Sequence, residues 1–274
     1  MSRNNFFERV MGFVVWGAAL ITISALVFIV CFILFKGVPH ITPSIFEWEY
    51  TSENASLTPA MISTVVMTVL SLAIAVPLGV GAAIYLAEYA NRNGAAAKIA
   101  RVTAETLAGI PSIIYGLFGM LFFVTFLGWG FSLLAGAFTL AIMILPLIIR
   151  SAEEALKAVP DAYREGAFGL GAGKLRMVLR IALPSAMGGI FAGVALAIGR
   201  IVGETAALIY ASGTVAQIPE TPMESARTLS VHMYALSSEG LHINEGYATA
   251  AVLLAIVILI NAISEYIAKR AGSV

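Results

Sequence analysis

The sequence predicts an all-α membrane protein of six membrane-spanning helices, with the architecture of a single transmembrane domain over residues 1–274. Of these residues 59% are hydrophobic and only 12% are charged, too few charged side chains to cover the surface of a soluble domain. The charged residues gather between apolar runs of about 20 residues or more, the length that crosses a bilayer. Basic residues favour alternate segments between these runs, which is the pattern that orients membrane proteins.

Six apolar runs define the expected helices. The first exceeds the apolar part of a signal peptide and lacks a clear cleavage site, so we expect an uncleaved anchor. Pro77, Pro111 and Pro146 interrupt three of the runs, which predicts kinked helices packed in a bundle. The expected spans are approximately residues 10–35, 60–87, 106–127, 131–149, 186–211 and 247–268.

Basic residues indicate the orientation. They lie before the first run, between the second and third, after the fourth and at the C-terminal end: Arg3, Arg9, Arg92, Lys98, Arg101, Arg150, Lys157, Arg164, Lys174, Arg176, Arg180, Lys269 and Arg270. The alternate segments hold mostly glutamate, with Lys36 and Arg227 as their cations. We therefore expect both termini to be cytoplasmic. The long outer segment, 213–246, is expected to contain a short interfacial helix near residues 229–236.

The cytoplasmic segment 150–185 is long, whereas the other cytoplasmic segment is short, and long connections usually have a function. Pro160 and Asp161 suit a helix start, glycines at 169, 171 and 173 interrupt it, and a second helix is expected from Lys174 to Leu183. Two short helices joined at a glycine turn would form a stiff elbow that can seat in another protein.

A spaced motif in this elbow resembles the EAA loop of ABC importer permeases. The family pattern is Glu-Ala-Ala, three residues, Gly, nine residues, Ile, one residue and Leu-Pro; the matching residues are Glu165, Gly166, Ala167, Gly171, Ile181, Leu183 and Pro184. Only Gly166 departs, replacing alanine with another small residue. The resemblance implies that the elbow inserts into a nucleotide-binding subunit, with the contact carried by Glu165, Gly166, Ala167 and Gly171.

The glycines of the elbow do not form a phosphate-binding loop. Such a loop would need glycine at Phe168 and serine or threonine at Leu175, and no strand is expected before it. We therefore expect this chain to bind no cofactor and not to hydrolyse ATP. ATP and Mg would be used by a separate ATPase subunit.

Two charged residues, Arg200 and Glu204, lie inside the fifth apolar run. An arginine at mid-membrane costs about 2.5–3.5 kcal/mol even on the lenient insertion scale, so something must offset it. Spaced by four, the two side chains are expected to share a helix face and pair, with the Thr205 hydroxyl nearby. The pair could only fix packing, or it could form an anion site, since a guanidinium suits a tetrahedral oxyanion. Glu204 could then gate the path and accept a hydrogen bond from the proton that phosphate carries near neutral pH and sulfate does not.

Three segments resemble the permeases of Pst-type phosphate importers: VPLGVGAAIYLAEYA from Val76, LAGIPSIIYGLFG from Leu107 and GRIVGETAALIYASG from Gly199. The segment TLSVHMYALSSEG from Thr228 resembles PstA rather than PstC. This implies a type I importer-like permease in the bacterial plasma membrane that forms half of the pathway. The implied partners are a PstC-like permease, two PstB-like ATP-binding subunits and a PstS-like extracytoplasmic binding protein. The alternatives are a PstC-type subunit, or a permease for molybdate, sulfate or phosphonate.

An intramembrane enzyme is the main rival class of function. It would need a Ser–His pair, paired aspartates or a His-x-x-x-His set within the spans, and the sequence has none. His40, His232 and His242 all fall in expected outer segments, where we expect them to be surface residues.

Overall fold

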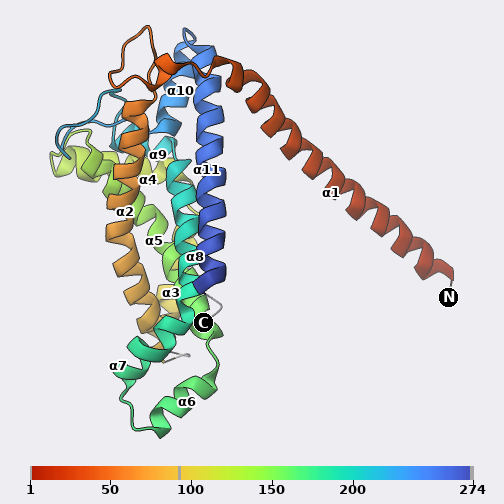
Figure 1. Ribbon diagram of the computed structural model, residues 1–274. Coiled ribbons are helices and arrows are strands. Elements are labelled where there is room, and N and C mark those ends of the chain that lie inside the picture. Colours follow the sequence, from red (N-terminus) through yellow and green to blue (C-terminus); the bar gives the residue numbers. More distant parts are fainter. Residues whose placement is uncertain (1, 92–93, 272–274) are drawn as a thin grey trace.

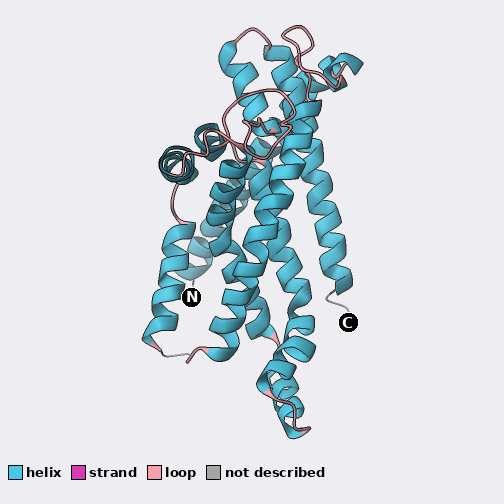
Figure 2. Cartoon of the chain, turned by 90° about the vertical axis from the view of Figure 1, so that its left-hand side faces the viewer, coloured by secondary structure: helices cyan, strands magenta, loops and turns pink. Residues whose placement is uncertain are grey.

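The computed structural model describes residues 2–91 and 94–271, and all regular structure in these ranges is helical. The body of the bundle consists of four long helices that run along one another in both views (Figures 1 and 2): α2 (Thr58–Ile84), α5 (Leu133–Ala158), α8 (Leu183–Val202) and α11 (Ile243–Ala271). Within these two ranges, five helices are long and apolar enough to cross a membrane, or up to six if one bent pair counts as a span. The expected all-α membrane fold is confirmed.

Helix α5 lies at the centre of the bundle and packs against both α2 and α8. Of its most apolar stretch 61% is buried, a larger share than in the other spans. Glycines permit the close approach: an added Cβ would lie 2.7 Å from the Cγ2 of Ile148 at Gly79, and 2.6 Å from the Cβ of Ala155 at Gly189. Small residues are how membrane helices gain contact area where lipid is as apolar as protein.

The third expected span is not one helix. It divides into α3 (Ala95–Ala108) and α4 (Ser112–Gly119), and α4 continues as a π-helical segment, Met120–Phe126. The two parts meet at an angle of 98°. Pro111 has no N–H group to donate and holds an extended ψ of 139°, so the helix cannot pass through it. The continuous helix expected at 106–127 is therefore wrong.

The fifth expected span is also wrong in its last part. Helix α8 ends at Val202, and a short α9 (Ala206–Ala211) follows in place of the continuous helix expected at 186–211. At its other end α8 is longer than expected. The second helix of the elbow, α7 (Lys174–Met177), runs through a π-helical segment, Val178–Ala182, directly into α8.

The cytoplasmic segment expected at 150–185 begins later than the sequence suggested, because α5 continues to Ala158. Ion pairs spaced by four stabilise this extension: Arg150 with Glu154 at 3.0 Å and Lys157 with Glu153 at 2.6 Å. The elbow itself consists of α6 (Asp161–Gly169) and α7, and it projects from one end of the bundle (Figure 1). The helix start at Asp161 and the second elbow helix are confirmed.

Helix α1 (Ser2–Gly37) diverges from the bundle, as Figure 1 shows. None of its most apolar stretch is buried, so this span stands apart from the packed helices of the bundle. Only its C-terminal end touches the bundle, where the Phe32 and Tyr247 rings lie 6.0 Å apart. A helix that is apolar on all faces is suited to lipid or to another membrane protein.

The end of the bundle opposite the elbow carries α10 (Leu229–Glu239) and the segment between α1 and α2 (Figure 1). Two short 3₁₀ turns, Val38–His40 and Pro43–Phe46, open this segment. Ile45, Leu57 and Leu229 share a small apolar core that fixes it to α10. The helix expected near residues 229–236 is confirmed.

Candidate functional site

The elbow turns at Gly171, where the backbone φ is +77°. The Gly171 N–H donates to the Phe168 carbonyl at 2.9 Å, and the Ala172 N–H donates to the Ala167 carbonyl at 3.0 Å. These two bonds form a Schellman motif, which ends α6 and satisfies its last carbonyl groups. Gly171 is therefore required by the shape of the elbow itself.

The four motif residues of the elbow do not share one surface. Glu165 and Gly166 are exposed, and nothing lies within 4 Å of a Cβ placed on Gly166. Ala167 is buried in an apolar core with Met177 and Val178 of the same elbow. Glu165 and Gly166 thus face outward, whereas Ala167 and Gly171 hold the elbow in shape. Their predicted contact with an ATPase stays a prediction.

We expect Gly171→Ala to weaken the elbow by about 1–2 kcal/mol, because a residue with a Cβ is disfavoured at positive φ. Gly166→Ala is the matched control: it lies inside α6 with open space around it, and alanine should stabilise that helix by up to about 1 kcal/mol. Amide hydrogen exchange over residues 161–172 measures both changes. Equal exchange rates in the two variants would contradict this account of Gly171.

Arg164 fastens the elbow to the bundle. Its guanidinium pairs with Glu88 at 2.8 Å and donates to the carbonyls of Leu156 at 2.7 Å and Val159 at 2.6 Å. Both charged side chains are largely buried, with 15% of Arg164 and 5% of Glu88 exposed. One side chain therefore closes the end of α5 and joins α6 to the π-helical segment Tyr85–Tyr89 that follows α2. Sequence reasoning missed this joint, although Arg164 directly precedes the motif.

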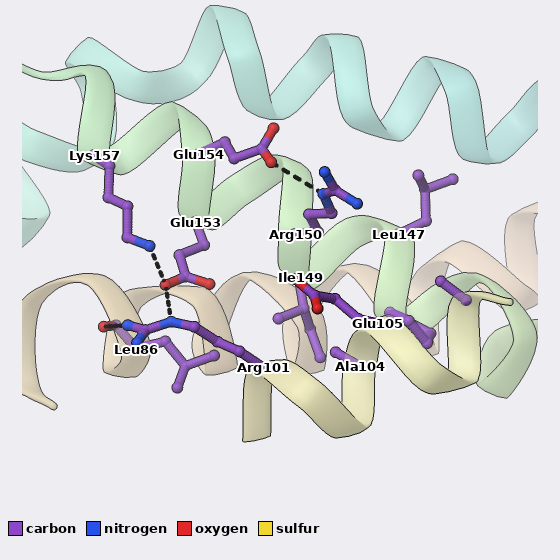
Figure 3. A pocket seen from close by; sticks show the side chains of 12 residues that line it. Leu86, Arg101, Ala104, Glu105, Leu147, Ile149, Arg150, Glu153, Glu154 and Lys157 are labelled. Atoms are coloured by element: carbon purple, nitrogen blue, oxygen red, sulfur yellow. Dashed lines mark hydrogen bonds and ion pairs between the residues drawn. The ribbon is translucent and has the colours of Figure 1, made fainter. Parts of the chain in front are cut away.

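A second ionic cluster ties α3 to α5 beside this joint (Figure 3). Glu153 accepts from Arg101 at 2.8 Å and from Lys157 at 2.6 Å, and Arg101 also donates to the Leu86 carbonyl at 3.1 Å. These groups line a pocket of about 210 Å³. The pocket's three cations are matched by three glutamates, with Arg150, Glu105 and Glu154 completing the six. Because the charges balance, the cluster serves as a clamp between helices rather than as an anion site.

The two broken helices meet in the bundle. A Cβ on Gly116 of α4 would lie 2.7 Å from the Cα of Ala207 in α9, and Gly119 lies against Ala211. The Tyr115 hydroxyl of α4 donates to the Leu107 carbonyl of α3 at 2.7 Å and so bridges one break. Breaks of this kind at facing positions mark binding sites in many membrane transporters, since they place helix ends and free backbone groups inside the protein.

Arg200 occupies the last turn of α8, next to this meeting point, and is partly exposed. Within the described residues it has neither a hydrogen bond nor an ion pair, although it lies within electrostatic range of the Tyr115 hydroxyl. The expected pairing with Glu204 is wrong, because α8 ends at Val202 and the two residues do not share a helix face. A guanidinium without a counter-ion is free to hold an anion.

Glu204 and Thr205 lie in the break between α8 and α9. Glu204 is buried, and its Oε1 accepts the Ala207 N–H at 3.1 Å, which caps α9. Its main-chain carbonyl accepts from the Ser230 hydroxyl of α10 at 2.5 Å. Thr205 is half-buried between the two helices. Glu204 therefore links the break to α10, a role that the expected continuous helix concealed.

His232 of α10 is fully buried, so the expectation of a surface histidine is wrong for it. Its Nε2 lies 3.3 Å from the Ala55 carbonyl, and its ring meets Tyr50 edge-on with centroids 5.9 Å apart. Burial lowers the pKa of His232 to about 4, and the nearby charge of Arg227 acts in the same direction. The imidazole is neutral at physiological pH.

This pKa predicts that stability depends on pH. Because the unfolded chain binds a proton near pH 6.5 and the folded chain only near 4, the stabilisation is complete above 6.5 and is lost as pH falls toward 4. The loss is at most about 3 kcal/mol. Thermal unfolding of the purified protein in detergent should show a steeper fall in Tm below pH 6.5 for the wild type than for His232→Gln. Parallel curves of Tm against pH for the two proteins would contradict this prediction.

Comparison with known proteins places this arrangement among transport permeases. Residues 75–272 match the family model described as binding-protein-dependent transport system inner membrane component. The probable ABC transporter permease YqgI of Bacillus subtilis is 31% identical over 241 residues, covering 81% of each chain. The phosphate transport system permease PstA 2 of Mycobacterium bovis is 34% identical over 216 residues, 77% of this chain and 71% of that one. A permease in the inward-facing MetNI methionine ABC transporter has a TM-score of 0.63 at 20% identity, covering 78% and 94%.

Proposed function

The chain belongs to the family of binding-protein-dependent transport system inner membrane components, and from this we propose that it is the permease subunit of an ATP-driven phosphate importer. It would form half of the translocation pathway and take the energy of ATP from a separate subunit. Relatives named as phosphate permeases of the PstA type support this substrate.

The observation that carries the proposal is the position of Arg200 at the far end of the helix that starts in the elbow. The helix is continuous from Lys174 to Val202, so Arg200 lies roughly 39 Å along it from Lys174. A rigid element of this kind can pass a displacement of the elbow to the anion site. The mechanism is alternating access, in which closure of the ATPase shifts the pathway between outward-open and inward-open states.

Phosphate suits Arg200 and the polar groups of the break that follows α8. The guanidinium offers paired donors to two phosphate oxygens and cannot lose its charge. Glu204 uses Oε1 in the α9 cap, and its second oxygen can accept a hydrogen bond from the hydroxyl group that phosphate still carries near neutral pH. Thr205 adds a hydroxyl beside it. Glu204 would then both stabilise the chain between α8 and α9 and select an oxyanion that carries a proton.

The proposed assembly has a PstC-like permease, two PstB-like ATPase subunits and a PstS-like binding protein, with ATP and Mg held by the ATPase. Glu165 and Gly166 face outward and would contact the ATPase subunit. The exposed side chains of Phe168 and Leu170 would contact it too. We place the elbow and both chain termini in the cytoplasm. The described end of α11 lies toward the elbow end of the bundle, which supports that placement of the C-terminus (Figure 1).

Competition uptake tests the substrate. Proteoliposomes that contain the whole importer are given labelled phosphate with excess unlabelled phosphate, sulfate, molybdate or phosphonate. We expect only unlabelled phosphate to suppress uptake strongly. Suppression by one of the other oxyanions, with weak uptake of phosphate itself, would assign the chain to that oxyanion instead. Glu204→Gln should lose the preference for phosphate over sulfate, and an unchanged preference would remove Glu204 from the selection.

A further inference from the structure

Arg227 is a buried cation at the end of the bundle that carries α10, and it has no counter-ion in the described part of the chain. Only 4% of the residue is exposed, and within the described residues its Nε and Nη2 atoms are buried without a hydrogen-bond partner. The Tyr50 ring lies 5.0 Å from the Cζ atom, so a cation–π contact offsets part of the cost. The aromatic face does not provide hydrogen-bond acceptors for the N–H groups of Nε and Nη2. A buried guanidinium in this state is unfavourable until an anion arrives.

The two free nitrogens form one edge of the guanidinium. Nε and Nη2 point their N–H groups in the same direction, and this edge binds an oxyanion through two parallel hydrogen bonds. Arg227 therefore presents the bidentate edge rather than a single donor.

His232, whose imidazole also contacts the Tyr50 ring, supplies a hydrogen-bond acceptor. Its Nε2 faces the Ala55 carbonyl, which can only accept, so Nε2 carries the proton of the neutral imidazole. Nδ1 is then an acceptor, and it too is buried without a partner in the described part of the chain. Two donors and one acceptor match an oxyanion that keeps a proton. Phosphate is such an anion near neutral pH, whereas sulfate can only accept.

The segment Glu47–Ser56, which we call the lid, covers these groups. Asn54 holds the lid together: its side chain bonds Glu47 at 2.8 Å, the Glu49 carbonyl at 2.9 Å and the Thr51 N–H at 2.9 Å. Ala55 has a φ of +43°, the only positive φ among the described non-glycine residues. The lid thus closes over two unpartnered polar groups with a strained residue at the contact, which favours opening.

We propose that Arg227 and His232 form an oxyanion site beneath the lid, at which phosphate binds when the lid opens and before it reaches Arg200. This inference rests on the proposed function and extends it with a separate entry station. The Ser230 hydroxyl, between the two site residues in sequence, bonds the Glu204 carbonyl. The entry station is therefore joined directly to the break that carries the inner site.

Hydrogen exchange of the lid tests this site. The assembled importer without ATP is exposed to inorganic phosphate or sulfate, and exchange of residues 47–57 is followed by mass spectrometry. We expect phosphate, and not sulfate, to change lid exchange in the wild type. In Arg227→Gln and Arg227→Lys the phosphate concentration at half-effect should rise at least about tenfold, because each loses the bidentate edge. His232→Gln should reduce the preference for phosphate over sulfate.

Arg200→Gln is the matched control, since it removes the inner arginine and leaves the lid intact. It should keep the wild-type response of the lid to phosphate. The same response in Arg227→Lys as in the wild type would overturn the site, as would equal effects of sulfate and phosphate. Size-exclusion chromatography verifies that each variant assembles. If the wild type takes up phosphate but phosphate does not change hydrogen exchange of its lid, only this inference fails. Absence of phosphate uptake by the wild type would refute the proposed function.

Discussion

We expect phosphate uptake to fall at least about a hundredfold when Arg200 is replaced by glutamine. Two hydrogen bonds from a charged donor are lost, each worth about 1.5–3 kcal/mol, and tenfold corresponds to about 1.4 kcal/mol. Lysine keeps the charge but not the planar fork, so Arg200→Lys should retain part of the uptake. The measurement is uptake of labelled phosphate into proteoliposomes supplied with ATP on the elbow side.

Arg180→Gln is the control for this experiment. Arg180 lies on the same continuous helix and is exposed near the elbow, so its loss should leave uptake close to wild type. Thermal unfolding separates binding from packing. If Arg200 only braced helices, Arg200→Gln would lower Tm in proportion to its loss of uptake. Loss of uptake with an unchanged Tm supports the anion site, and wild-type uptake in Arg200→Gln would refute it.

Breaking the ion pair between Arg164 and Glu88 is expected to uncouple ATP hydrolysis from transport. Removing one partner leaves a largely buried charge, which costs about 3 kcal/mol at this partial exposure. The elbow would then move without carrying the end of α2 and the end of α5 with it. Arg164→Gln and Glu88→Gln should each lower the amount of phosphate taken up per ATP hydrolysed.

The double variant distinguishes this joint from general damage. Because the two side chains interact, Glu88→Gln combined with Arg164→Gln should destabilise the protein less than the sum of the single changes. Arg176→Gln is the control within the elbow, since Arg176 is exposed. Additive effects of Glu88 and Arg164, with an unchanged ratio of uptake to hydrolysis, would contradict a coupling role.

The helical class and the elbow were predictable from the sequence because they depend on local signals. Long apolar runs define spans, and Pro160, Asp161 and the glycines mark helix ends within a few residues. The breaks at Pro111 and Gly203 were harder to predict. A proline often only kinks a membrane helix, whereas here the chain turns by 98° at Pro111 and α4 packs on α9 through Gly116.

The candidate site was predictable in its residues but not in its geometry. Arg200 is visible as a charge in an apolar run, whereas its separation from Glu204 depends on the end of α8. The joint between Arg164 and Glu88 spans 76 positions, and the cluster of Tyr50, Arg227 and His232 joins segments even further apart. A single sequence has no local signal for such pairs.

The meeting of α1 with α11 has a consequence for biogenesis. Helix α1 leaves the ribosome long before α11, yet the contact of Phe32 with Tyr247 and the seat of Gly37 against α11 join them. Until α11 is inserted, α1 lacks this contact and is solvated by lipid, which its internally bonded backbone tolerates. A chain truncated before α11 would therefore insert its early spans but leave α1 without its contact to the bundle.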